Sequence, residues 1–395
     1  MRRFRFFVFL LALTLLPQAI AVSHLMSWLG GFGDVRATAL AALVPLLAVA
    51  INIPLVVELL RRQRQAAVPR LLAAVLETPW TAFWMGSVLY AILLAVWGLA
   101  TFVVGLFALD ARTAMPAWVA ASPFGLALYG TIFASRVLRR ERVTIPVAGL
   151  PPGWQGARIV QLSDLHVGRH MTPQRLRAIA ARAAALKPDV LVVTGDIVHN
   201  SPAFARRAAE AIASVPSTFG AFACLGNHDF YAGADKVARE MEAAGVSVLR
   251  NQGRLLERNG DGLWLCGVDD VWSSRFDLQA ALRGKPRDAA VVLLSHQPNT
   301  WPLAQAAGVH LQLSGHTHGG QLALLWLHRS LSLARFITPF VAGLYRAGQS
   351  YLYVNRGAGL VMPLVRLGAR PEVTEITLVA ATPEQAREPH ALAHA

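Results

Sequence analysis

The sequence predicts an N-terminal α-helical transmembrane region of four spans, followed by an α/β domain in which helices flank two packed central β-sheets. The 395 residues are 54% hydrophobic, above the roughly 45–50% typical of soluble domains, and most of the excess lies before residue 139. The second half alternates short β-branched runs with helical patterns, as α/β folds do. The expected boundaries are 1–142 for the transmembrane region, 143–380 for the α/β domain and 381–395 for a polar, disordered tail.

Four segments before residue 139 are apolar enough to cross a bilayer, which needs about 20 such residues. They are residues 6–22, 38–59, 81–109 and 117–137. Pro45 and Pro54 in the second segment are tolerable where neighbouring helices satisfy the freed backbone groups. Alternatively, Arg2, Arg3 and the apolar run that ends at Ala21 form a cleavable signal peptide, which would remove the first span.

Arginines are distributed unevenly around these segments. They cluster at 2–5, 61–70 and 136–142, whereas the other two loops hold only Arg36 and Arg112. By the positive-inside rule, both ends of the region and the whole α/β domain face the cytoplasm. The two cysteines, Cys224 and Cys266, lie in apolar runs, so we expect buried thiols in a reducing compartment.

Several elements of the α/β domain can be predicted from local patterns. Thr172 before Pro173 is typical of a helix N-cap, and this helix is expected to extend to about Leu186. Further helices are expected near 203–214 and 234–244. Residues 255–257 and 263–268, joined across a Gly-rich turn, predict a β-hairpin.

Five motifs in the α/β domain carry metal-binding residue types. They are Asp-Leu-His at 164–166, Gly-Asp at 195–196, Gly-Asn-His-Asp at 226–229, Ser-His at 295–296 and Gly-His-Thr-His at 315–318. Each follows or closes a strand-like run, at 159–162, 190–193, 222–225, 291–294 and 309–313. Because open α/β sheets place ligands at the carboxyl ends of their strands, we expect these side chains to meet at one edge.

The donors are carboxylates, imidazoles and an amide without cysteine, a set that suits Mn²⁺, Fe²⁺ or Zn²⁺. Donors two residues apart, as in Asp164/His166 and His316/His318, point the same way if the backbone is extended. The carboxylate of Asp196 has two oxygens and can bridge two ions. Two ions about 3.5–4 Å apart lower the pKa of a shared water. Each histidine alone is as well explained by a structural role, but the whole set predicts a dinuclear metal site.

With these motifs the sequence resembles the calcineurin-like metallophosphoesterases, and within them a bacterial branch that has membrane-attached members. The resemblance covers about residues 155–380 and includes GHTHGGQ at 315–321 and YVNRG at 353–357. It implies a metal-dependent phosphoric ester hydrolase that cleaves a phosphodiester or pyrophosphate bond by attack of a metal-bridging hydroxide. It also implies a multi-pass protein of the bacterial inner membrane.

The resemblance further implies a role for each donor, with Mn²⁺ expected and Fe²⁺ or Zn²⁺ as alternatives. One ion would be bound by Asp164, His166, Asp196 and His318. The other would be bound by Asp196, Asn227, His296 and His316. The catalytic residues would be His228, which protonates the leaving group or stabilises the phosphoryl oxygens, and Asp229, which orients it.

One departure from the superfamily pattern narrows the substrate. Protein serine/threonine phosphatases continue the second motif as GDxxDRG, whereas residues 195–200 here read GDIVHN. The second Asp and the Arg that help to hold a phosphoprotein are therefore absent, which disfavours protein dephosphorylation. His199 either adds a donor at the rim of the pocket or is a plain loop histidine.

The expected partners are the lipid bilayer and a phosphorylated small molecule or lipid-linked substrate; the resemblance allows a UDP-diacylglucosamine pyrophosphatase. Residues 322–345 mix apolar residues with arginines. They form either an amphipathic helix and loop packed on the core or a membrane-dipping, acyl-chain-binding lip. No nucleic-acid-binding module is recognisable, so no nucleic acid is expected. The alternative function is a membrane scaffold or sensor with a vestigial metal site, but the complete ligand set favours the enzyme.

Overall fold

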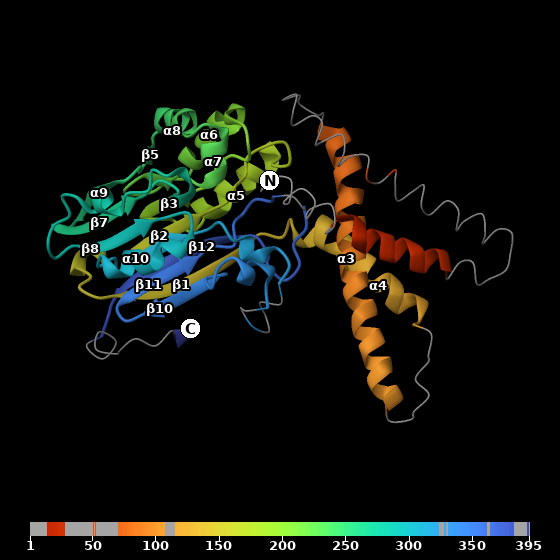
Figure 1. The fold of residues 1–395 in the computed structure, drawn as a ribbon. Helices are drawn as coiled ribbons and strands as arrows, with labels where there is room; N and C mark the ends of the chain where they lie inside the picture. Colours follow the sequence, from red (N-terminus) through yellow and green to blue (C-terminus); the bar gives the residue numbers. More distant parts are fainter. Residues whose placement is uncertain are drawn as a thin grey trace. The chain divides into compact units, whose positions relative to one another are not determined.

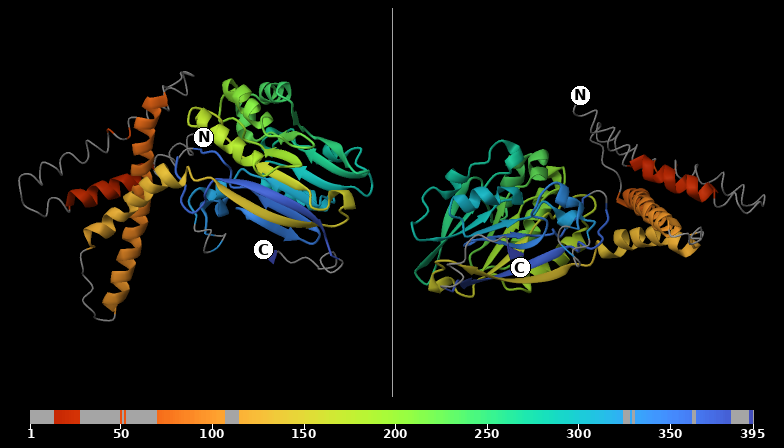
Figure 2. Two further views of the ribbon diagram at one scale, coloured as in Figure 1. Left: turned by 180° about the vertical axis from the view of Figure 1, so that it is seen from behind. Right: turned by 60° about the horizontal axis from the view of Figure 1, so that its bottom comes forward.

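The structure, a computed structural model, describes residues 14–27, 50, 52, 70–106, 115–323, 328, 331–361, 364–382 and 393–394. The chain divides into two compact units (Figures 1 and 2). The first consists of Met1–Ser135 with Met362–Val365, and the second of Arg136–Val361 with Arg366–Ala395.

Two long apolar helices dominate the described part of the first unit. Helix α3 spans Arg70–Leu106, and α4 spans Ala117–Tyr129 and continues as a π-helical turn over Gly130–Ala134. The helices pack closely at Gly86, where a Cβ atom would overlap the ring of Phe124. A residue without a side chain is what allows two apolar helices to approach this closely.

The structure supports two candidate membrane spans rather than the four predicted. Glu77–Gly105 and Ala117–Ala134 are long and apolar enough, and they correspond to the predicted spans 81–109 and 117–137. Residues 14–27 are helical, but this described piece is shorter than the roughly 20 residues that a bilayer requires. The start of the predicted span 6–22 and nearly all of 38–59 lie outside the described residues.

The first sheet of the second unit has six strands in the order β1-β12-β2-β3-β4-β5. The strands are β1 (Arg139–Val147), β2 (Arg158–Leu162), β3 (Val190–Thr194), β4 (Ala221–Cys224), β5 (Val246–Val248) and β12 (Glu372–Ala380). Strands β2 to β5 are parallel neighbours, whereas β12 runs antiparallel to β2 and parallel to β1. The carboxyl ends of β2, β3 and β4 therefore lie at one edge of this sheet.

The second sheet has seven strands in the order β13-β10-β11-β9-β8-β7-β6. The strands are β6 (Gln252–Arg258), β7 (Asp261–Gly267), β8 (Ala290–Leu294), β9 (Leu311–Ser314), β10 (Gly343–Ala347), β11 (Ser350–Val354) and β13 (Ala393–His394). The predicted hairpin is confirmed as the antiparallel pair β6–β7. Strand β13 falls within the tail that was predicted to be disordered; residues 383–392 of that tail lie outside the described residues.

The three predicted helices of this unit are present as α5 (Pro173–Ala184), α6 (Ala205–Ala213) and α8 (Ala234–Ala243). Three further helices were not predicted: α7 (Asn227–Ala232), α9 (Leu278–Leu282) and α10 (Trp301–Ala306). Helix α5 begins where expected, because the Thr172 hydroxyl accepts a hydrogen bond from the backbone N–H of Arg175 at 3.1 Å. Pro173 then occupies the first helical position, where its missing N–H costs nothing.

The two sheets pack face to face, and helices cover their outer faces (Figure 1). Along β3, Val190 and Val192 pack against the second sheet, whereas Leu191 and Val193 pack against helices α5, α6 and α8. Alternate residues of β7 and β8 divide in the same way between the inter-sheet core and the side of α9 and α10. A strand buried on both faces needs apolar residues at every position, which explains the continuous apolar runs.

The described residues of 322–345 (322–323, 328 and 331–345) contain no α-helix, the element that one of the two interpretations expected. They contain a short 3₁₀ helix, Leu333–Phe336, and the start of β10. The side chains of Phe336 and Ile337 are 90% and 71% exposed. In the same segment Ala334, Val341 and Ala342 are buried, so these two exposed side chains lie next to a packed loop.

Candidate metal centre

The five predicted motifs come together at the strand ends of the second unit. Asp164 and His166 follow β2, Asp196 follows β3, and Asn227 begins α7 just after β4. From the second sheet, His296 follows β8, and His316 and His318 follow β9. Both sheets therefore contribute donors to one place, as the motif positions predicted.

Six of the donors form two compact clusters. The first comprises Asp164, His166 and His318, and the second comprises Asp196, His296 and His316. In the first cluster, Nε2 of His318 lies 3.0 Å from Nε2 of His166 and 3.3 Å from Oδ1 of Asp164. In the second, Nδ1 of His316 lies 3.2 Å from Nε2 of His296.

The carboxylate of Asp196 joins the two clusters. Its Oδ2 atom lies 3.5 Å from Nε2 of His166 and 3.3 Å from Nε2 of His296. Its other oxygen, Oδ1, accepts a hydrogen bond from the backbone N–H of His228 at 2.9 Å. One oxygen is thus fixed by the backbone while the other faces imidazoles of both clusters.

The backbone at the donors is left-handed and not extended. Asp164, His166, Asp196, His316 and His318 have φ between 45° and 72°, and they make up half of the ten described non-glycine residues with positive φ. The expectation of extended segments was therefore wrong. Such conformations cost of order 1–3 kcal/mol each and cluster at functional sites.

Two glycines leave the space that the carboxylates occupy. A Cβ atom at Gly226 would overlap Oδ1 of Asp196, and one at Gly315 would overlap Oγ of Ser163 and Oδ2 of Asp164. The hydroxyl of Ser163 donates a hydrogen bond to Oδ2 of Asp164 at 2.6 Å. The close packing against the two glycines and the hydrogen bond from Ser163 therefore restrict the positions of both carboxylates.

The electrostatics of the cluster favour a positive charge between the carboxylates. Burial lowers the pKa of His296, but the charge and hydrogen bond of Asp196 outweigh it and raise this pKa to about 10. Burial raises the pKa of Asp164 to about 6, and it lowers the pKa of His166 and His318 well below the usual range. Neutral imidazoles beside a carboxylate are the form in which histidine binds a metal.

The residues present fit a pair of divalent cations. Nδ1 of His296 donates a hydrogen bond to the carbonyl oxygen of Thr194, 2.8 Å away, so Nε2 is left to bind a metal. Among the described residues, Oδ1 of Asn227 is buried without a hydrogen-bond donor. An orphaned buried oxygen costs about 1–3 kcal/mol unless something such as a cation satisfies it.

His228 and Asp229 are held by different groups. Nδ1 of His228 lies 2.7 Å from the carbonyl oxygen of His199 and 2.9 Å from Oδ1 of Asn200. The carboxylate of Asp229 accepts hydrogen bonds from three backbone N–H groups, those of Gly226, Ile197 and Val198. The imidazole ring of His228 is thus held by the loop after β3 and not by Asp229, whose carboxylate instead connects that loop to the loop after β4.

Sequence reasoning missed Arg366, which supports the first cluster. Its fully buried guanidinium lies 3.0 Å from Nδ1 of His318 and donates hydrogen bonds to the carbonyl oxygens of Arg356, Gly357 and Gly359. It thereby connects the loop after β9 to the loop after β11. A lone arginine in the apolar run 360–367 was the sequence feature that could have revealed it.

Comparisons with known proteins agree with this geometry. The calcineurin-like phosphoesterase family profile matches residues 157–320. "Transmembrane protein with metallophosphoesterase domain" from Danio rerio is 33% identical over 267 residues, covering 64% of this chain and 60% of that protein. "Uncharacterized metallophosphoesterase YkuE" from Bacillus subtilis is 30% identical over 259 residues, 63% of this chain and 88% of that protein. "Phosphodiesterase YaeI" from Escherichia coli is 30% identical over 231 residues, 56% and 82% respectively.

The chain belongs to the calcineurin-like phosphoesterase family. Its match spans 60% of the length of the Danio rerio relative and most of the Bacillus subtilis one. The matched region contains every donor of the two clusters.

Gly315→Ala should abolish metal binding without unfolding the protein, because the new Cβ atom would displace Asp164. The measurement is metal content after loading, by elemental analysis, with circular dichroism as the check on folding. Gly308→Ala is the matched control: it is strained, at φ +76°, but its Cβ meets nothing within 4 Å. That variant should lose about 1–2 kcal/mol of stability and keep its metal. Equal metal content in the two variants would contradict the steric argument.

Proposed function

We propose that the chain is a membrane-anchored phosphoesterase that uses two metal ions to hydrolyse a phosphodiester or pyrophosphate bond. The observation that carries the proposal is the position of one Asp196 oxygen beside imidazoles of both clusters. A relative named a phosphodiesterase supports the choice of a diester. Because every ligand position is occupied, nothing favours a scaffold with a vestigial site.

In this proposal, one ion is held by Asp164, His166, Asp196 and His318. The other is held by Asp196, Asn227, His296 and His316. When bound, two divalent ions, Mn²⁺ by the donor chemistry, supply Lewis acidity at the phosphoryl oxygens.

His228 is the proposed proton donor to the leaving group. Its Nδ1 faces two acceptor oxygens, so Nδ1 carries a hydrogen atom and donates hydrogen bonds to them. This orients the ring and leaves Nε2 to transfer a second proton to the leaving oxygen. Asp229 acts on this ring only indirectly, since its bonds to backbone amides position the loop that carries Asn200 and the helix that carries His228.

Replacing His228 separates chemistry from metal binding. His228→Ala should keep two metal equivalents and lose about 10²–10⁴-fold in rate for a poor leaving group. The loss should be much smaller for p-nitrophenolate, which hardly needs protonation. The contrasting variant, Asp196→Asn, should lose metal and bis-p-nitrophenyl phosphate hydrolysis together, because a neutral amide cannot balance two cations. A metal-free His228→Ala, or equal losses with both leaving groups, would refute the acid role.

The membrane part is proposed to start and end in the cytoplasm, so that the catalytic domain faces the cytoplasm. Arginine clusters support this orientation, since Arg136, Arg139, Arg140 and Arg142 follow the last apolar helix. Cytoplasmic loops carry this excess of arginine in membrane proteins.

Topology reporters test this orientation. Alkaline phosphatase fused after Ala395 should be inactive, whereas the same enzyme inserted in the 110–113 loop should be active outside the cytoplasm. Green fluorescent protein at the two positions is the control, because its fluorescence should show the opposite pattern. Activity of the phosphatase after Ala395 would mean that the orientation is reversed.

A lipid-linked phosphoester is the proposed substrate class. The exposed Phe336 and Ile337 lie on a segment anchored to the metal-binding loop, since Ser332 donates to the carbonyl oxygen of Gly319 at 3.1 Å. From residue 289 to 371 the sequence holds six arginines and neither Asp nor Glu. Apolar side chains in positive surroundings are what an anionic lipid surface attracts.

The double variant Phe336→Ser with Ile337→Ser tests the lip. Burying one large apolar side chain contributes about 1.5–3 kcal/mol, so hydrolysis of a diester in anionic vesicles should fall at least about tenfold. Hydrolysis of water-soluble bis-p-nitrophenyl phosphate should not change. Leu303→Ser, at a 58% exposed position on α10, is the control and should affect neither substrate. Equal rates of the lip variant and the wild type on vesicles would exclude lipid contact at this lip.

A further inference from the structure

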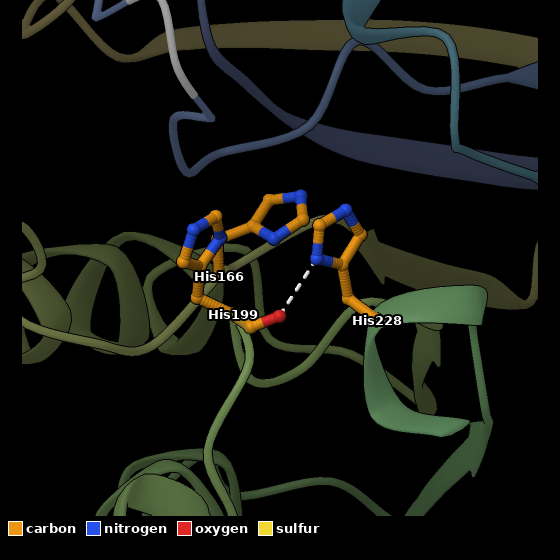
Figure 3. Close-up of side chains that lie close together, drawn as sticks. All are labelled: His166, His199 and His228. Carbon is orange, nitrogen blue, oxygen red and sulfur yellow. Dashed lines mark hydrogen bonds between the residues drawn. The ribbon is translucent and has the colours of Figure 1, made fainter. Parts of the chain in front are cut away.

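The side chains of three histidines, His166, His199 and His228, lie close together (Figure 3). One of them, His166, also belongs to the first cluster. The ring centroids of His166 and His228 are 4.8 Å apart, those of His199 and His228 are 5.2 Å apart, and those of His166 and His199 are 5.5 Å apart. One ligand atom from each ring lies within 4.8 Å of the other two. His166 is buried, whereas His199 and His228 are half-buried, so the group opens toward solvent.

The donor chemistry of this group differs from that of the neighbouring clusters. Asp164 and Asp196 supply carboxylates to those clusters, but the three-histidine group offers imidazole nitrogens alone. Imidazole suits zinc, whereas manganese prefers oxygen ligands. The two kinds of site should therefore select different ions.

The hydrogen bonds of His228 are those of a metal ligand. Metal-binding histidines usually donate the proton of their second ring nitrogen to a carbonyl or carboxylate oxygen. Nδ1 of His228 does so, to the carbonyl oxygen of His199 (Figure 3) and to Oδ1 of Asn200. Nε2 of the neutral ring therefore keeps its lone pair.

A second observation is the state of His166. Its Nδ1 atom is buried and has no hydrogen-bond partner among the described residues, while its Nε2 lies among the donors of the first cluster. A buried nitrogen without a partner is costly, and a bound cation would satisfy it.

We propose that His166, His199 and His228 form a third metal site, selective for zinc and inhibitory. Zinc would bind through one ring nitrogen of each histidine, and in His228 through the lone pair of Nε2. An Nε2 atom bound to zinc cannot carry a proton to the leaving group. The inhibition rests on the proposed function of His228, whereas the binding of the ion does not.

The binding test uses the full-length protein loaded with two equivalents of Mn²⁺ and titrated with Zn²⁺. The wild type should bind one additional equivalent of zinc, by calorimetry, and keep both manganese ions, by elemental analysis. In His199→Gln the affinity for this zinc should fall at least about tenfold, while the backbone carbonyl that holds His228 remains. His170→Gln is the matched control: it removes a nearby histidine that is bonded to Arg169 and lies outside the group.

The activity test follows bis-p-nitrophenyl phosphate hydrolysis during the same titration. Zinc should inhibit the wild type and His170→Gln, whereas His199→Gln should need at least about tenfold more zinc to lose half of its own zinc-free rate. Excess Mn²⁺ should inhibit none of them. Zinc that merely displaces manganese, or a third equivalent that His199→Gln binds as tightly as the wild type, would overturn the proposal. If the protein bound this one zinc ion beside two manganese ions but had no hydrolytic activity, the third metal site would stand and the proposed function would be refuted.

Discussion

The metal centre depends on the carboxylate of Asp196, because this one side chain contacts candidate metal ligands from both sheets. One oxygen faces His166 from the first sheet and His296 from the second. The other is fixed by a backbone N–H, and glycine at 226 leaves room for it. A buried negative charge is stable only if its surroundings compensate it. Here the imidazoles of the two sheets, the backbone N–H of His228 and the space left by Gly226 together provide that compensation.

The strands and helices of the α/β domain were predictable because short stretches of sequence determine them. The runs 190–193 and 291–294 are apolar at every position since both faces of each strand are buried, and Thr172 with Pro173 marks the start of α5. In the N-terminal region, the described residues contain helices that match two of the predicted spans, 81–109 and 117–137, because long apolar runs are a local pattern as well.

The assembly of the site could not be predicted from residue spacing, whereas the family resemblance assigned His316 and His318 to different ions. His316 and His318 are two residues apart, yet they belong to different clusters. Their left-handed backbone directs them there, and that conformation is held by tertiary contacts and not by residue preference. The bonds of Asp229 to three amides, and of Arg366 to the carbonyl oxygens of a distant loop, are likewise set only by the complete fold.

The order of strands in the first sheet has a consequence for how the protein is made. Strand β12, from residues 372–380, lies between β1 and β2, which are the first strands of the domain to leave the ribosome. The sheet therefore stays open until residues 372–380 have been synthesised, and the pairing of β1 with β12 closes over more than 200 residues, a separation that slows folding. The apolar helices that precede β1 are therefore complete long before the α/β domain can close.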